Sequence, residues 1–470
     1  MKVSVSTLEG HTSSVLCVAL DHTNNSSCVA AGAESGPTPI RLWDTRINGK
    51  TCQLAIHTHG TATASSSSSS SSTVPFHNGV TSVAFAPGHL LFCSWEQSIA
   101  AYDLRLPNKT VLQSCDDHVW LLENFATDEI NQISISAVQA SGKWKVACCE
   151  DGGDVHVFHA GADLDAIGID HTVLSGVHTN LCTGVRWQPG SMRCLYSGSM
   201  DATICMWDVS KSKPITGGHI TCGNDATGAS TTGGSQLLNP PFVNSLDVSP
   251  SVCAVGLGDG TIGLYNTRTQ QSLGRLRGHD SATACVTFAR SVCDDEEGEA
   301  KEGNTQAWNH LFSAGNDQKI CLWNLDEGTN GGGGRSGGRS GGRSGGRSGG
   351  RGGGDNEDQE EWDEYLKEST TTPSSRSSKS KKHKKKGKRR KKKKKNEEQR
   401  PNETKDTEAE EDTNSGQKET AVDPNDDRIP VRFEHPHKIN WLDASKSRNG
   451  GMRLFVADES NAITVYSGFQ

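Results

Sequence analysis

The chain has 470 residues, of which 33% are hydrophobic and 22% are charged, and its formal net charge is −8. It has no run of 18 apolar residues, and residues 1–5 lack the apolar stretch of a signal peptide, which argues against a membrane-spanning helix and a secreted protein. Residues 379–395 hold 14 Lys or Arg and no acid. The rest of the chain therefore has 34 basic against 56 acidic residues, a net charge of −22 that disfavours a general nucleic-acid binder.

The 15 cysteines stand mostly alone within apolar runs, and no C-x-x-C pair occurs. This spacing predicts reduced, buried thiols rather than disulfides or a zinc site. We expect no metal and no cofactor.

Seven alternating apolar segments end in a short strand that closes on an aromatic residue. These strand ends are residues 40–44, 99–103, 155–158, 204–208, 262–266, 320–324 and 463–466. Period-two alternation with short turns predicts antiparallel strands, not helices. A repeat of one strand-rich unit favours a binding platform over an enzyme.

The spacing of the closing aromatic residues predicts how the repeats are organised. Five successive gaps measure between 49 and 59 residues, but the gap from Trp323 to Tyr466 measures 143. Residues 326–428 lie inside that gap and read as disordered; without them 40 residues remain, about one repeat. We therefore expect six repeats in residues 1–325, a disordered Gly/Arg-rich, polybasic and acidic insertion at 326–428, and the last repeat in 429–470.

The repeats resemble the WD-repeat family. Gly-His pairs at 10–11 and 278–279 and Trp-Asp pairs at 43–44 and 207–208 carry the resemblance. It implies an all-β, seven-bladed propeller with the insertion before the last blade. Residues 2–5 stand where a fourth strand would, so they either complete the last blade and close the ring or form a frayed end.

The resemblance also implies a hydrogen-bonded tetrad in two blades, because buried polar groups need partners. The expected tetrads are His178, Ser197, Asp201 and Trp207, and His279, Ser313, Asp317 and Trp323. Ser, His and Asp together could instead form a hydrolase triad. The trio recurs from blade to blade and no G-x-S-x-G elbow occurs, so we expect a structural role and no enzyme activity.

The insertion contains two kinds of basic sequence. Four Arg-Ser-Gly-Gly copies within 330–354 are typical of a linker, with weak RNA binding by residues 330–395 as the alternative. The run 379–395 predicts a nuclear localisation signal, a nucleic-acid patch or a solvated charge run. The residues of the expected signal are Lys381, Lys382, Lys384, Lys385, Lys386, Lys388, Arg389 and Arg390. We expect a nuclear protein, with additional cytoplasmic residence as the alternative.

A narrower resemblance within the family suggests a partner. It rests on Q-L-L-N-P-P at 236–241, the basic insertion, and K-I-N-W-L at 438–442 followed by V-A-D at 456–458. These segments resemble those of a group within the family that is identified with substrate receptors of the cullin-4 ubiquitin ligase. Such receptors bind the ligase's adaptor, damaged-DNA-binding protein 1, through W-D-x-R boxes. The expected contacts are Asp44 and Arg46 in a full box and Asp103 and Arg105 in a box that begins with Tyr; residues 265–268 form a poorer third.

Two functions remain open at this point. One is a non-catalytic scaffold that recruits an unknown protein substrate to the ligase through arginine forks on one rim. The other is a nuclear propeller in ribosome assembly or chromatin complexes, with RNA contacts by the basic insertion. A single box could also be a chance match, whereas two boxes in consecutive repeats are more specific.

Overall fold

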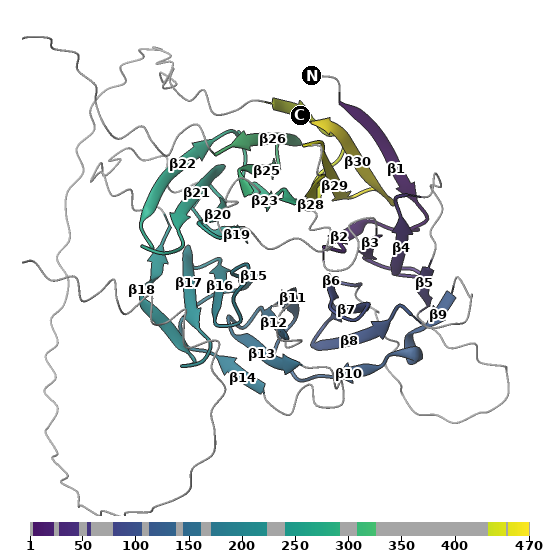
Figure 1. Ribbon diagram of the computed structural model, residues 1–470, viewed down its shortest axis with the longest axis horizontal. Helices are drawn as coiled ribbons and strands as arrows, with labels where there is room; N and C mark the ends of the chain where they lie inside the picture. Colours follow the sequence, from purple (N-terminus) through teal and green to yellow (C-terminus); the bar gives the residue numbers. More distant parts are fainter. Residues whose placement is uncertain are drawn as a thin grey trace, which may run out of the picture. The chain divides into compact units, whose positions relative to one another are not determined.

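The structure is a computed structural model, and it describes residues 3–22, 28–46, 54–57, 79–105, 112–137, 144–160, 171–222, 240–291, 308–325, 431–447 and 450–469. The chain divides into two units, Met1–Gly333 with Asp423–Gln470, and Gly334–Val422. All described residues belong to the first unit, which is a ring of seven sheets (Figure 1).

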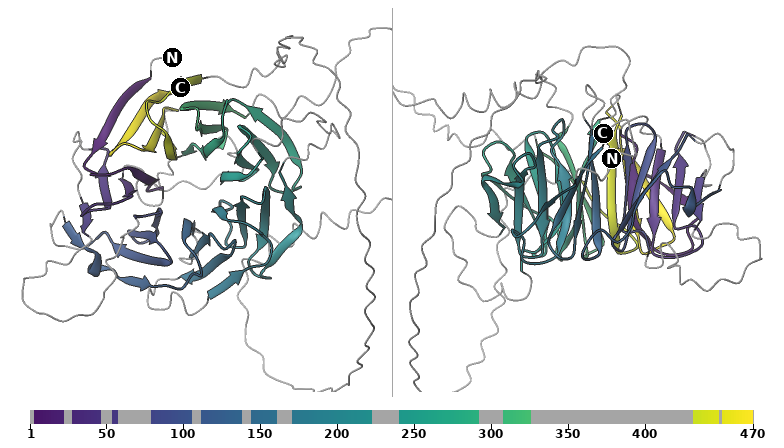
Figure 2. Two further views of the ribbon diagram at one scale, coloured as in Figure 1. Left: turned by 180° about the vertical axis from the view of Figure 1, so that it is seen from behind. Right: turned by 90° about the horizontal axis from the view of Figure 1, so that it is seen from below.

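Each sheet is one blade, and its strands follow each other from the centre of the ring outward (Figures 1 and 2). Blade one has β2 (Val15–Leu20), β3 (Cys28–Ala33), β4 (Ile40–Asp44), β5 (Leu54–His57) and β9 (Leu112–Ser114); blade two has β6 (Ser82–Ala86), β7 (Leu90–Trp95), β8 (Ser98–Asp103) and β10 (Trp120–Leu122). Blade three has β11 (Ile130–Ala137), β12 (Trp144–Glu150), β13 (Val155–Ala160) and β14 (His171–Leu174); blade four has β15 (Cys182–Trp187), β16 (Cys194–Ser199), β17 (Thr203–Asp208) and β18 (Lys213–Thr221).

Blade five has β19 (Val243–Val248), β20 (Val252–Leu257), β21 (Thr261–Asn266) and β22 (Ser272–Arg277); blade six has β23 (Thr283–Phe288), β25 (His310–Gly315), β26 (Lys319–Asn324) and β27 (Val431–Glu434). Blade seven has β28 (Ile439–Lys446), β29 (Met452–Asp458), β30 (Ala462–Phe469) and β1 (Ser4–Glu9), with β24 (Arg290–Ser291) alongside β28. A 3₁₀ turn, η1, spans Cys115–Asp117. The prediction of an all-β, seven-bladed propeller is confirmed.

The two ends of the chain meet in blade seven. β1 pairs antiparallel with β30 from Ser4 opposite Ser467 to Glu9 opposite Ala462. This pairing joins the N-terminal strand to the last repeat and covers the outer edge of β30. The ring is therefore closed by main-chain hydrogen bonds between strands more than 450 residues apart in the sequence.

One predicted boundary needs correction. We expected residues 429–470 to form the last blade, but β27 pairs with β26 and so completes blade six. The chain leaves blade six after β26 and returns to it at β27, so residues 326–430 interrupt that blade between its third and fourth strands. The reason is that a sequence repeat ends at its third strand, whereas the fourth strand of a blade comes from the start of the next repeat.

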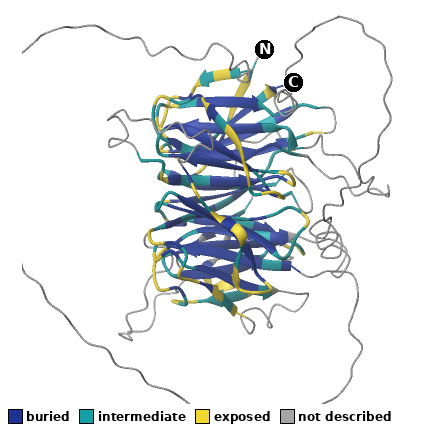
Figure 3. Cartoon of the chain, turned by 90° about the vertical axis from the view of Figure 1, so that its left-hand side faces the viewer, coloured by how far each residue is buried: buried dark blue, intermediate teal, exposed yellow. Residues whose placement is uncertain are grey.

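The core lies at the seams between neighbouring blades, and the exposed residues lie mostly on outer strands and loops (Figure 3). At the seam between blades seven and one, Trp43 is buried against Phe455 and Ile463. Close approach at the seams requires glycine in the second strand: a Cβ at Gly198 would lie 2.5 Å from a methyl carbon of Val243 in the next blade. The cysteines among the described residues are free thiols, and all but Cys28 are buried, as their spacing predicted.

A group of charged side chains joins the inner strands of several blades. Asp247 lies 3.0 Å from the Arg290 guanidinium and 3.4 Å from that of Arg186. Asp443 accepts a hydrogen bond from the main-chain N–H of Leu20 and lies 3.6 Å from the His22 ring. Although burial opposes ionisation, the nearby His22 ring, the charge of Arg290 and the hydrogen bond from Leu20 lower the pKa of Asp443 to about 2.

Candidate functional site

The first candidate box follows β4, where the strand turns back. Asp44 accepts hydrogen bonds from the main-chain N–H of Arg46 at 2.9 Å and from its guanidinium, at 3.0 Å from Nε and 2.6 Å from Nη2. The Asp44 side chain is 12% exposed and that of Arg46 is 63% exposed. The carboxylate therefore sits in the turn and holds one edge of an arginine that otherwise faces solvent.

The second box has the same geometry at the end of β8. Asp103 accepts from the main-chain N–H of Arg105 at 2.9 Å, from its Nε at 3.0 Å and from its Nη2 at 2.8 Å. Its side chain is 17% exposed, against 61% for Arg105. The hydrogen bond from Arg105, opposed by partial burial, lowers the pKa of Asp103, so the carboxylate stays ionised.

This clamp fixes what each arginine can offer to a partner. A guanidinium has five N–H donors in a planar fork, and Asp44 or Asp103 takes two of them. Among the described residues, no other side chain or carbonyl accepts from the three remaining donors of each arginine, which suits them to oxygen acceptors of another molecule. Because the carboxylate restrains the exposed side chain, less conformational entropy is lost when a partner binds.

Among the described residues, blades four and five do not reproduce this clamp. In the third box, Asn266 accepts only from the main-chain N–H groups of Arg268 and Thr269 within the described residues, and its neutral amide forms no ion pair. In blade four, Asp208 accepts from the Ser210 main chain and hydroxyl, and an arginine from an earlier turn, Arg193, lies 3.4 Å away. Within the part of the chain that the structure describes, an exposed arginine clamped by the aspartate two positions before it therefore sets blades one and two apart from blades four and five.

The two boxes share one rim of the ring. Each blade repeats the same antiparallel order, so the third strands β4 and β8 end at the same rim, which we call the box rim. The middle residue of each box fixes its turn: Thr45 accepts a hydrogen bond from Arg453 of β29 at 3.0 Å, and Leu104 packs into the apolar seam between blades one and two.

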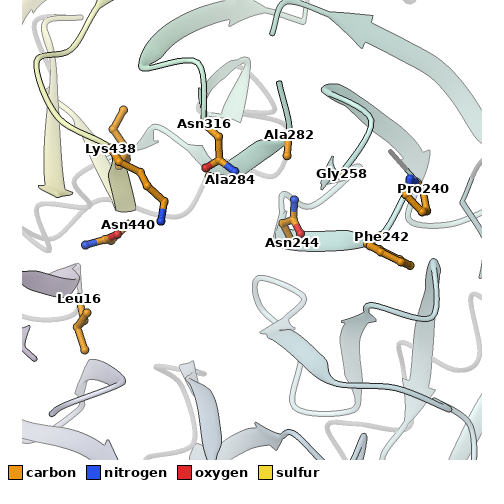
Figure 4. A pocket seen from close by; sticks show the side chains of 11 residues that line it. Leu16, Pro240, Phe242, Asn244, Gly258, Ala282, Ala284, Asn316, Lys438 and Asn440 are labelled. Atoms are coloured by element: carbon orange, nitrogen blue, oxygen red, sulfur yellow. The ribbon is translucent and has the colours of Figure 1, made fainter. Parts of the chain in front are cut away.

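A cavity of about 520 Å³ lies at the opposite rim, where the inner strands begin. Figure 4 shows that its wall combines apolar groups, such as Leu16 and Phe242, with Asn244, Asn440 and Lys438. Asn244 and Asn440 each donate Nδ2 to a carbonyl of the neighbouring blade, at 3.1 and 2.9 Å, which leaves each amide oxygen as an acceptor. The cavity is thus a second surface suited to a partner, separate from the box rim.

The predicted tetrads hold blades four and six. In blade four, Ser197 Oγ lies 2.7 Å from His178 Nε2 and accepts from Trp207 Nε1 at 2.8 Å, while Asp201 lies 3.4 Å from His178 Nδ1. Thr203 also contacts the ring, at 3.1 Å from Nδ1, a member the sequence reasoning did not include.

Blade six repeats this arrangement. Ser313 lies 2.8 Å from both His279 and Trp323, and Asp317 lies 3.1 Å from the histidine. Burial lowers the pKa of His178 and His279 despite the neighbouring aspartates, so both rings are neutral at pH 7 and act as structural hydrogen-bond bridges.

Blades seven and one depart from the tetrad in different ways. In blade seven, His435 contacts Tyr466 Oη at 2.8 Å and Asp458 at 2.7 Å, so a phenol replaces both Trp and Ser. In blade one, the equivalent second-strand residue is Ala31, and neither ring nitrogen of buried His11 has a hydrogen-bond partner among the described residues. Burial, with the charge of Arg41, lowers the pKa of His11 to about 3.

Several sequence predictions cannot be placed. The expected localisation signal, the RNA-binding stretch 330–395 and residues 236–239 lie outside the described residues. No group of side chains suited to hold a metal occurs among the residues that the structure describes. In that part of the chain, no helix is long and apolar enough to cross a membrane.

The fold, the repeated tetrads and the family-model matches show a seven-bladed β-propeller that contains WD repeats, a fold that generally acts as a non-catalytic protein-interaction scaffold. A model of the WD domain, G-beta repeat, matches residues 2–36 and 171–208. The WD40 β-propeller domain of Doa1 aligns with a TM-score of 0.53 at 13% identity, covering 100% of this chain and 98% of that domain, which supports the fold alone.

Within this class, the chain is similar to the WD repeat-containing protein 53 homolog of Dictyostelium discoideum. The two are 28% identical over 336 residues, which cover 69% of this chain and 78% of the relative. A TOPLESS-related protein 2 of Oryza sativa subsp. japonica is 26% identical over 164 residues, but these cover only 13% of that protein. The resemblance to WD-repeat proteins that the sequence suggested is therefore shown.

Proposed function

We propose that this propeller is a substrate receptor of a cullin-4 ubiquitin ligase and binds the adaptor, damaged-DNA-binding protein 1, through Arg46 and Arg105. The observation that carries the proposal is the pair of aspartate-clamped, exposed arginines on consecutive blades. Adjacent fixed guanidinium forks suit backbone carbonyls or carboxylates of a protein partner.

The separation of the two surfaces also supports this function. A receptor must hold the adaptor and a substrate at the same time, which requires two surfaces that do not overlap. The box rim would serve the adaptor, and the cavity at the opposite rim would serve the recruited protein. The cavity's apolar wall and amide oxygens suit an extended protein segment with apolar side chains and N–H donors.

The test is affinity purification of the full chain followed by mass spectrometry. The Arg46→Ala/Arg105→Ala variant should lose the adaptor and the cullin. The matched control is Arg268→Ala, which removes an arginine from the same position of blade five, where no aspartate clamps it. Adaptor recovery with the double variant at the wild-type level would rule out the boxes as the contact.

The second candidate function is an RNA-binding nuclear scaffold, favoured by the 14 cations within residues 379–395. Such contacts with phosphates weaken steeply with added salt. Deletion of residues 379–395 should then abolish salt-sensitive RNA binding without affecting adaptor recovery. RNA binding that persists after the deletion would reject this candidate.

A further inference from the structure

Blade one contains a strand that does not belong to its own repeat. β9 follows the second box in the sequence, yet it pairs in parallel with β5 at the outer edge of blade one, with Leu112 opposite Ala55 and Ser114 opposite His57. The chain then turns through η1 and returns to blade two as β10, which pairs with β8. A single short segment thus belongs to both blades that carry the boxes.

A hydrogen bond attaches this segment to the strand that ends in the second box. Tyr102, the residue before Asp103, donates from its hydroxyl to the main-chain oxygen of Cys115 at 3.0 Å. Cys115 is 5% exposed and lies in the same apolar cluster as Tyr102 and Ile56. The hydrogen bond therefore links the strand that ends in box two to the outer strand of blade one.

Residues in or next to both boxes pack in the apolar cluster between blades one and two. Leu42 precedes box one in β4, Leu104 is the middle residue of box two, and both contact the cluster between blades one and two. The main-chain N–H of Leu104 also donates to the carbonyl of His89 in the turn between β6 and β7, at 2.9 Å. A shift of one blade against the other would disturb both turns at once.

We infer that the segment Leu112–Asp117, which we call the strap, joins the two boxes into one docking unit, so that a rigid partner engages Arg46 and Arg105 together. This inference rests on the proposed function. When two contacts are fixed on one body, the second forms within the complex and costs little further entropy. The partner must then present two oxygen acceptors, carbonyl or carboxylate, at a matching fixed separation.

The test is a double-mutant cycle on Arg46 and Arg105 in two backgrounds, with the purified adaptor as the probe. One background is wild type. The other loosens the strap by Tyr102→Phe, which removes the hydroxyl bonded to Cys115, together with Leu112→Gly, Gln113→Gly and Ser114→Gly. The control for outer-strand damage is Ser272→Gly/Leu273→Gly in β22 of blade five, which lies next to Gly274.

In the wild-type background, each single arginine variant should lose almost as much affinity as the double variant. The loosened strap should weaken binding on the order of tenfold, and the two arginine effects should become additive. Hydrogen exchange at Ala55–His57 should increase with the loosened strap but not with the control. A folded strap variant with wild-type affinity, coupling and exchange would overturn the inference.

Failure of the proposed function gives a different pattern. In that case neither arginine substitution changes adaptor binding in either background, while hydrogen exchange still reports whether the strap restrains blade one. If the Ala55–His57 amides of the strap variant exchange as slowly as those of wild type, the inference that the strap restrains blade one is overturned. This result does not depend on the adaptor affinity.

Discussion

Ser197→Ala tests whether the tetrads hold the blades. Ser197 Oγ bridges His178 Nε2 and Trp207 Nε1, and all three side chains are buried. Alanine would leave two buried polar groups without that partner, each at a cost of about 1–3 kcal/mol. The Asp201 contact is with the other ring nitrogen and does not replace the lost partner, so we expect a total loss of about 2–6 kcal/mol in the free energy of unfolding.

The assay is equilibrium unfolding in urea, followed by tryptophan fluorescence, with Ser272→Ala on an exposed outer strand as the control. The reverse change is Ala31→Ser, at the same register position of blade one, which would offer His11 a hydroxyl. We expect it to gain about 0.5–1.5 kcal/mol. A loss for Ser197→Ala no larger than that of Ser272→Ala would refute the bridging role.

Two further predictions concern the seams between blades and the charged group on the inner strands. Gly198→Ala should destabilise the ring by about 1–3 kcal/mol in thermal unfolding, because the added Cβ would overlap Val243 of the next blade. Asp443 has a lowered pKa, so its ionised form stabilises the fold above pH 4 and this contribution is lost as the pH falls from about 4 to about 2. Asp443→Asn should therefore lower the free energy of unfolding by about 2 kcal/mol at pH 7. The difference in urea midpoint between this variant and wild type should vanish near pH 2. An unchanged difference at pH 2 would contradict the stabilising role of the ionised Asp443 side chain.

The sequence allowed prediction of the features that depend on local pattern. Strand alternation and the closing aromatic residues predicted the seven blades, and the Gly-His and Trp-Asp pairs indicated the family. The residues of the boxes could also be predicted from the sequence, because Asp and Arg stand two positions apart in each box. The clamp between Asp44 and Arg46 could not be predicted, because the sequence does not show that the Arg46 guanidinium donates to the Asp44 carboxylate.

Features that depend on partners far apart in the chain could not be predicted. β9 is three residues long and pairs with a strand of another repeat, so it leaves no periodic signal. His435 joins Asp458 and Tyr466 in a variant of the tetrad that lacks both Trp and Ser. His11, in contrast, carries the Gly-His signal, yet Ala31 stands where its serine partner would be.

We propose that the two clamped arginines on the box rim bind the ligase adaptor. The most direct measurement is the dissociation constant of the purified full chain and damaged-DNA-binding protein 1 for wild type, Arg46→Ala/Arg105→Ala and Arg268→Ala. We expect a loss in affinity of about 100-fold or more for the double variant and wild-type affinity for Arg268→Ala. Equal affinity of all three proteins, each shown to be folded, would contradict it.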